Sequence, residues 1–107
     1  MGHIQTVDEN NFETEVMHAS LPVLVDFWAE WCPPCKKLGP TLEQAAEELS
    51  GRVKIVKVNT QEATALTAEY GIMNIPTMII FRNGEEIARL IGNKPLQKLI
   101  EELESYL

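Results

Sequence analysis

The feature that most constrains the fold is a long apolar run in the first third of the chain, residues 22–31, which read PVLVDFWAEW. β-Branched and aromatic residues follow one another there almost without interruption, as is typical of a central strand that is buried on both faces. Asp26 lies in the middle of this run, and two cysteines, Cys32 and Cys35, follow it directly. A strand of this kind needs a covering layer on each side of its sheet.

The segments around this strand alternate between strand and helix patterns. Strand patterns are predicted at residues 4–7, at 52–59 and in a hairpin at 76–92 that turns at Asn83-Gly84, a favoured tight-turn pair. Helical spacing of apolar residues is found after Asn10, at 38–49, at 63–70 and at 96–103. We expect Asn10 to cap the first helix, and Pro40 to kink the second.

The resulting order, β-α-β-α-β-α-β-β-α, predicts an α/β fold. Strands separated by helices imply right-handed parallel crossovers, and the terminal hairpin adds antiparallel strands. We therefore predict a central mixed five-stranded sheet flanked by four helices. A chain of 107 residues with 45% apolar content is expected to form a single domain over residues 1–107.

Composition and charge exclude several classes of function. Sixteen acidic against nine basic residues give a net charge of −7, which disfavours binding to nucleic acid or to an anionic membrane surface. No run approaches the roughly 18 apolar residues of a membrane span, and the first residues do not resemble a signal peptide. We expect a cytoplasmic monomer.

Cys32 and Cys35 are the only cysteines, so they cannot build a framework of structural disulfides. A C-x-x-C sequence that follows a buried strand and begins a helix is the context of a redox motif. Cys32 would lie at the helix N-terminus, whose partial positive charge and unpaired N–H groups stabilise a thiolate. Cys35 would lie one turn further on, close enough to attack a mixed disulfide formed on Cys32.

Two other classes remain open at this point. In a metal or iron–sulfur protein, two chains would have to combine their cysteine pairs, because one chain offers two thiolates where a tetrahedral site needs four ligands. Neither His3 nor His18 has the spacing of a metal ligand. In a binding or assembly subunit, the thiols would be incidental.

Several motifs occur together over nearly the whole chain: VLVDFWAEWC, PCK, Pro40, KVN, YGI, IPT, NGE and Gly92. In this order and spacing they resemble the thioredoxin family. The resemblance implies a thioredoxin fold and a dithiol–disulfide oxidoreductase that takes part in electron transport and reduces disulfide-containing proteins. It implies that Cys32 attacks and Cys35 resolves, with no cofactor or metal. A separate thioredoxin reductase is expected to re-reduce the pair, since no nucleotide or flavin motif is found.

Asp26 alternates with Leu24 and Trp28 along the apolar strand, so we expect its carboxylate to be desolvated and its pKa to be raised. A buried acid behind a dithiol can accept the proton of Cys35. Lys57 follows Ile55 on its strand, a pattern that by itself indicates an ordinary strand lysine. The resemblance alone places Lys57 near the buried acid and among the catalytic residues.

The resemblance also implies a substrate surface around Cys32. Most X-Pro bonds are trans, but the family holds the bond that corresponds to Ile75-Pro76 in the cis form beside the cysteines. A substrate strand could then pair with the backbone of Ile75. The remaining members of this predicted apolar collar are Trp31, Ile91 and Gly92.

The chain departs from the family pattern at three places: Pro33 replaces a common Gly, Met73-Asn74 replaces small or basic residues, and Gln61 replaces a common Asp. Proline suits a helix start, so Pro33 and Pro34 should leave the fold intact. We expect Pro33 to remove an N–H donor near the Cys32 sulfur. Weaker stabilisation of the thiolate would make the protein more reducing.

Overall fold

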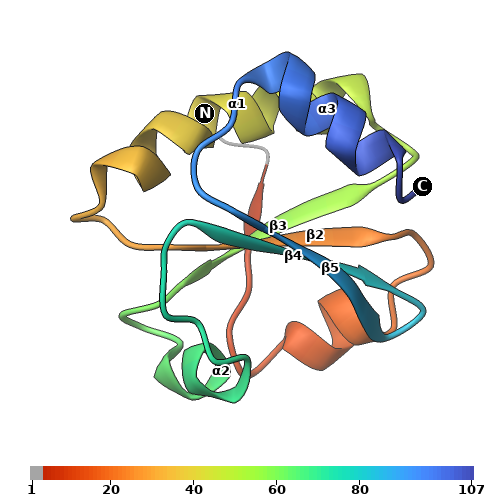
Figure 1. The fold of residues 1–107 in the computed structure, drawn as a ribbon. Helices are drawn as coiled ribbons and strands as arrows, with labels where there is room; N and C mark the ends of the chain where they lie inside the picture. The colour runs from red at the N-terminus through yellow and green to blue at the C-terminus, as the bar shows by residue number, and fades with distance from the viewer. Residues whose placement is uncertain (1–3) are drawn as a thin grey trace.

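The computed structural model describes residues 4–107 as one sheet between two layers of helices (Figure 1). The elements in chain order are β1 (Gln5–Thr6), η1 (Glu13–Met17), β2 (Val23–Trp28), α1 (Pro33–Glu48), β3 (Lys54–Asn59), α2 (Thr64–Glu69), β4 (Thr77–Arg82), β5 (Glu85–Ile91) and α3 (Leu96–Glu104). This order confirms the predicted alternation of strands and helices.

The sheet has the strand order β1-β3-β2-β4-β5, so β2 lies at its centre. β3 is parallel to both β1 and β2, while β4 is antiparallel to β2 and β5. The mixed five-stranded sheet is therefore confirmed. The hairpin between β4 and β5 turns where predicted, and its two turn residues, Asn83 and Gly84, both have positive φ angles of 54° and 79°.

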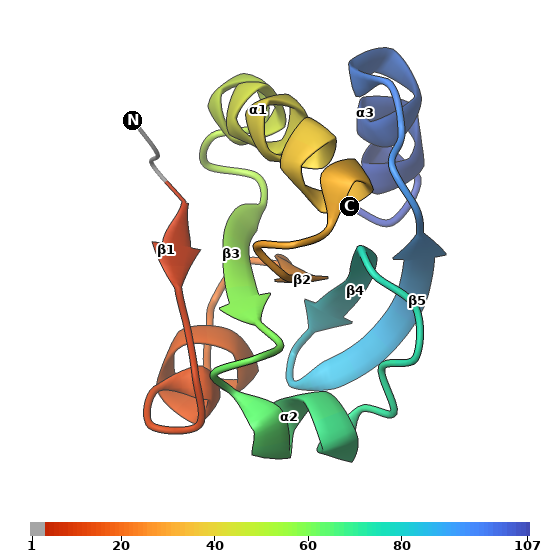
Figure 2. The ribbon, with the colours of Figure 1, turned by 90° about the vertical axis from the view of Figure 1, so that its left-hand side faces the viewer.

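α1 and α3 cover one face of the sheet, and η1 and α2 cover the other (Figures 1 and 2). The side chains of β2 alternate between these layers, as a strand's period of two requires. Leu24 packs in the cluster under α1 and α3, whereas Val25 and Phe27 pack in the cluster toward η1 and α2. Burial on both faces explains the unbroken apolar run.

β2 ends at Trp28, three residues before the end of the apolar run. The carbonyl oxygen of Trp28 still accepts a hydrogen bond from the N–H of Thr60, at 2.9 Å, just beyond β3. The chain then turns, and the N–H of Cys32 donates to the carbonyl of Ala29 at 3.2 Å. This turn carries the cysteine pair from the centre of the sheet to the start of α1.

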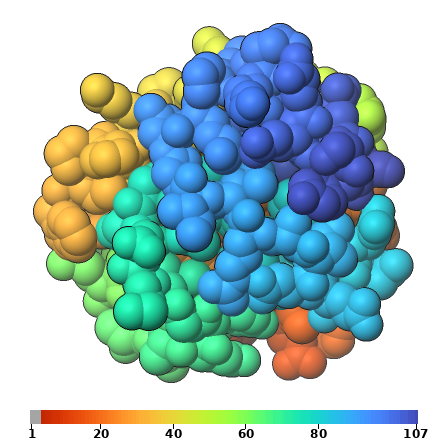
Figure 3. Space-filling view, in the orientation of Figure 1, coloured from red at the N-terminus to blue at the C-terminus, as the bar shows by residue number. Residues whose placement is uncertain are grey.

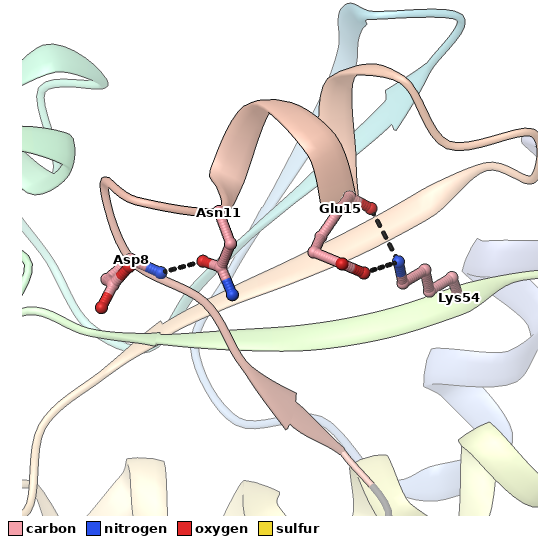
Figure 4. A network of polar contacts seen from close by, with 4 residues as sticks. All are labelled: Asp8, Asn11, Glu15 and Lys54. Carbon is pink, nitrogen blue, oxygen red and sulfur yellow. Dashed lines mark hydrogen bonds and ion pairs between the residues drawn. The ribbon is translucent and has the colours of Figure 1, made fainter.

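The prediction that Asn10 caps a helix is wrong. The segment forms only the short π-helical turn η1, which begins after Phe12 without a side-chain cap. The nearby polar side chains bond to the backbone before the turn, since Asn11 Oδ1 accepts from the N–H of Asp8 at 2.8 Å. Lys54 of β3 donates to the backbone carbonyl of Glu15, at 2.8 Å, and pairs with its carboxylate, which holds η1 against the sheet (Figure 4).

α1 runs from Pro33 to Glu48 as one helix, with Pro40 inside it. Its buried side chains are Cys35, Leu38, Leu42 and Ala45, which follow helical spacing and face the sheet. Pro40 is exposed on the opposite side. The cysteine that the sequence places one turn into the helix therefore points toward the sheet and its central strand.

Candidate active site

The cysteine pair lies where the turn after β2 becomes α1. Cys32 is the N-cap residue of α1, with extended backbone angles of φ −102° and ψ 105°, and Pro33 and Pro34 occupy the first two helical positions. The first N–H groups of a helix have no intrahelical partner, so two prolines cost the helix no hydrogen bond here. Cys32 and Cys35 are joined by a disulfide, with 5.2 Å between their Cα atoms.

The sulfur of Cys32 accepts a hydrogen bond from the backbone N–H of Cys35 at 3.3 Å. An N-cap side chain accepts from the second or third helical N–H group. Cys35 supplies the third, and Pro34 has no N–H at the second. Pro33 occupies the first position, so this geometry favours Pro34 as the missing donor, and the effect of Pro33 on the sulfur stays a prediction.

Asp26 is buried beneath the cysteines, with 3% of its surface exposed. Burial raises its pKa from 3.8 to about 7, and the nearby charge of Lys57 opposes this rise. The oxygen Asp26 Oδ1 is fully buried and has no hydrogen-bond partner among the described residues. Its burial confirms the prediction made from the apolar strand.

Lys57 is the register partner of Asp26 across the parallel strands β2 and β3. Its ammonium lies 5.2 Å from the centre of the Trp28 ring, a cation–π distance. The structure therefore brings Lys57 beside the buried acid, as the resemblance implied. The residue pattern of the strand could not predict this position, because it does not reveal which residue of the neighbouring strand lies beside Lys57.

A cavity of about 100 Å³ borders both Asp26 and Cys35. Roughly 10–15 Å³ of such volume holds one water molecule, so the cavity has room for a small cluster. The indole N–H of Trp28 is another buried polar group of this region, and it finds no hydrogen-bond partner within residues 4–107. The lining residues are Ile4, Asp26, Trp28, Cys35, Lys36, Gly39, Leu42, Glu43 and Lys57.

The predicted apolar collar is formed by three segments that meet beside Cys32. The Ile75-Pro76 peptide bond is cis, and the carbonyl oxygen of Ile75 lies 3.8 Å from the Cys32 sulfur. The N–H of Gly92 donates to the carbonyl of Pro76 at 2.8 Å, which ties the end of β5 to this segment. In Figure 3 the start of α1, in orange, adjoins the teal segment before β4 and the blue segment after β5.

Two members of this collar are open to solvent, whereas the cysteines are buried. The exposed fractions are 63% for Trp31 and 57% for Ile91, against 3% for each cysteine. Trp31 and Ile91 are therefore exposed apolar side chains on the surface around Cys32.

Sequence reasoning missed one part of this surface, a hollow of about 260 Å³ beside the collar. Its residues come from four separate segments, so no local pattern marks them. The sequence signals were Trp31 and Ile75, which were predicted as collar residues, and the apolar Met73 close to the IPT motif, which the structure leaves 90% exposed. The lining residues are Trp31, Thr60, Thr67, Ile72, Met73 and Ile75.

Two further findings concern metal binding and membrane crossing. Within residues 4–107, no three side chains of His, Cys, Asp or Glu lie together as a set that could hold a metal ion. None of the helices in this described part of the chain is both long enough and apolar enough to cross a membrane.

A helix-capping cysteine in a C-x-x-C disulfide, beneath which a carboxyl group is buried, defines a thiol–disulfide redox centre. Comparison with known proteins agrees with this class. The sequence model of the family described as Thioredoxin matches residues 3–105. The chain therefore belongs to the thioredoxin family, and it is a protein-disulfide oxidoreductase that works through its own active-site disulfide.

Individual relatives cover nearly the whole chain. It is 42% identical over 104 residues to Thioredoxin of Pyropia yezoensis, covering 97% of each chain. It is 46% identical over 96 residues to Thioredoxin C-2 of Corynebacterium nephridii, covering 90% of this chain and 88% of the relative. It is 39% identical over 104 residues to Thioredoxin M-type, chloroplastic, of Spinacia oleracea, covering 97% of this chain and 58% of the relative.

Proposed function

We propose that Cys32 is the attacking thiolate and Cys35 the resolving thiol of this reductase. The observation that carries the assignment is the position of Cys32 as the N-cap of α1, where the Cys35 N–H reaches its sulfur at 3.3 Å. The helix N-terminus stabilises negative charge on an atom in that position. Cys35 is a residue of the helix itself and lines the cavity that also borders the buried acid, so it is placed to resolve the mixed disulfide.

The proposed reaction has two exchange steps. In the first, the Cys32 thiolate attacks one sulfur of a substrate disulfide, and the other substrate sulfur leaves as a thiolate. In the second, Cys35 loses its proton and attacks the Cys32 sulfur, which breaks the mixed disulfide and releases the second substrate thiolate. Two electrons pass to the substrate, and the protein is left with the Cys32–Cys35 disulfide seen in the structure.

Asp26 is proposed as the acceptor of the Cys35 proton. Its pKa of about 7 lets it hold a proton near neutral pH and release it again, as a general base requires. Both residues line the same cavity of about 100 Å³, in which water can carry the proton between them. Lys57 is proposed to act through Asp26, because its charge keeps the pKa of the acid from rising further.

The apolar collar is proposed to hold an extended substrate segment beside Cys32. Ile75 precedes β4, whose pairing begins at Thr77, so the backbone at Ile75 lies at the end of the sheet. A substrate strand that pairs there would place its disulfide against the sulfur that lies 3.8 Å from the Ile75 carbonyl. Trp31 and Ile91 supply apolar contact on either side of it.

The cellular setting is part of the proposal. Members of the thioredoxin family are generally re-reduced by a thioredoxin reductase, and we propose the same for this chain. We also propose a cytoplasmic monomer with one domain over residues 1–107. The spinach relative is named chloroplastic, so cell fractionation decides the compartment. A single cooperative unfolding transition and a monomeric mass in solution would support the remaining points.

Reduction of insulin disulfides with dithiothreitol as electron source tests the activity. The protein should accelerate precipitation of the reduced insulin chains over dithiothreitol alone, and Cys32→Ser should abolish the acceleration. Failure of the unaltered protein to accelerate the reaction would refute the activity. Acceleration by Cys32→Ser equal to that of the unaltered protein would refute the assignment of the attacking thiol.

A further inference from the structure

The hollow beside the collar is lined without charge. Its walls are the apolar side chains of Trp31, Ile72, Met73 and Ile75, and the hydroxyl residues Thr60 and Thr67 complete it. It adjoins the attacking sulfur through Ile75, whose carbonyl oxygen lies 3.8 Å from Cys32 Sγ. An uncharged hollow of about 260 Å³ beside the reacting atom fits an apolar side chain that flanks a substrate cysteine.

Met73 is the outermost wall of this hollow. Of the three methionines within the described residues, Met78 is fully buried and Met17 is half-buried, whereas Met73 is 90% exposed. The backbone on both sides of Met73 is fixed, since the N–H of Ile72 donates to the carbonyl of Thr67 at 3.0 Å and the Thr77 hydroxyl donates to the carbonyl of Asn74. The exposed thioether therefore belongs to an ordered part of the site.

A thioether in this position is open to oxidation by a hydroperoxide. The sulfur atom gains one oxygen and loses two electrons, while the O–O bond of the hydroperoxide breaks to leave water or an alcohol. The product, methionine sulfoxide, is polar where the thioether is apolar, and methionine sulfoxide reductases reverse the change. Burying this polar group against an apolar substrate side chain carries a desolvation cost that the thioether does not.

We propose that Met73 is a reversible oxidation site, and that its sulfoxide weakens binding of disulfide substrates that place an apolar side chain in the hollow. The inference rests on the proposed substrate surface. Oxidation of Met73 would change which substrates bind, and it would leave the dithiol chemistry unchanged. Substrates with small polar residues beside the disulfide do not need this wall and keep their affinity.

The test begins with the disulfide form of the protein, in which both cysteines are protected from peroxide. After limited treatment with hydrogen peroxide and its removal, peptide mass spectrometry measures the oxidised fraction of Met73, Met17 and Met78. Met73 should be oxidised first. Oxidation of Met17 or Met78 before Met73 would overturn the proposal, because exposure would then not decide the site.

Kinetics on two synthetic peptide disulfides give the functional readout. One peptide carries Leu on both sides of the attacked cysteine and the other carries Ser. Oxidation should raise KM for the Leu peptide by about tenfold, the effect of losing one apolar contact in a pocket, and should leave kcat and the Ser peptide nearly unchanged. An equal change for both peptides, or none for either, would overturn the inference.

Two variants control for the residue itself. Met73→Leu keeps an apolar wall without a sulfur atom, so its KM values before and after peroxide should be identical. Met73→Gln resembles the sulfoxide in polarity and should reproduce the selective rise in KM without peroxide. If Met73→Leu responded to peroxide as strongly as the unaltered protein, another residue would be responsible.

The same measurements separate this inference from the proposed function. An untreated protein that reduces neither peptide would refute the dithiol mechanism. An untreated protein that reduces both peptides, with KM values that oxidised Met73 does not alter, would leave the mechanism intact and refute the inference alone.

Discussion

Replacing Asp26 with Asn should stabilise the folded protein, and the gain should depend on pH in a defined direction. The folded structure raises the pKa of Asp26 from 3.8 to about 7, chiefly through burial. The folded state therefore binds more protons than the unfolded state between these two values, and stability falls as the pH rises through this window. Asn is uncharged at every pH, so the variant does not lose stability as the pH rises through this window.

The size of the effect follows from the shift in pKa. A change from 3.8 to about 7, at about 1.4 kcal/mol per pH unit, amounts to about 4 kcal/mol of unfolding free energy. Asp26→Asn should therefore gain about 4 kcal/mol above about pH 8 and almost nothing below about pH 4, where the acid is protonated in both states. Such a gain is large for one substitution.

Urea unfolding of the disulfide form at several pH values measures this difference without titrating thiols. Glu47→Gln, on the exposed face of α1, changes the net charge by the same amount and serves as the control. We expect its unfolding free energy to stay within about 0.5 kcal/mol of that of the unaltered protein. A gain for Asp26→Asn that is equal at low and high pH, or absent at high pH, would show that Asp26 is not desolvated as described.

Two further substitutions probe the electrostatics of the site. Lys57→Met removes the charge that lowers the pKa of Asp26, so the carboxyl titration followed by ¹³C NMR should move above about 7. A midpoint that stays or falls would contradict the pairing. Pro34→Ala adds an N–H at the second helical position, one of the two positions from which an N-cap side chain accepts. The variant should make the reduction potential less negative by about 30 mV or more in equilibration with glutathione. Pro33→Ala should change the potential less. Equal shifts for the two variants would contradict the assignment of the missing N–H donor to Pro34.

Long apolar patterns made most of the fold predictable. The apolar run at 22–31 predicted the central strand. The burial of Asp26 in the middle of this run was predictable from the apolar residues around it. The hairpin turn was predictable because Asn83 and Gly84 tolerate the positive φ angles that a tight turn requires. In each case one local physical requirement selects the residue type.

Short and polar segments were less predictable. Asp8, Asn10 and Asn11 can all cap a helix, so they are competing candidates for that role. In the structure Asp8 Oδ1 accepts from the N–H of Asn10, and Asn11 Oδ1 accepts from the N–H of Asp8. The structure resolves this competition before the turn begins, so Asn10 caps nothing and η1 stays short. Tertiary contact with Lys54, far along the chain, holds the turn instead.

The site divides in the same way. The cysteine pair and the buried acid could be identified from one continuous stretch of the sequence. Lys57 could be placed beside Asp26 only through the family resemblance, because the alternation of residues along a strand does not determine its register with the next strand. The hollow beside the collar could be predicted only in part: Trp31 and Ile75 were predicted as collar residues, whereas Thr60 and Thr67 join them only after the chain has folded.

Trapping the mixed disulfide tests the central claim most directly. Cys35→Ser should accumulate a covalent adduct with a protein disulfide substrate, because the resolving thiol is absent, and mass spectrometry should find the bond at Cys32. Cys32→Ser, treated in the same way, should accumulate none. An adduct formed equally well by Cys32→Ser, through Cys35, would contradict the assignment of Cys32 as the attacking thiol at the start of α1.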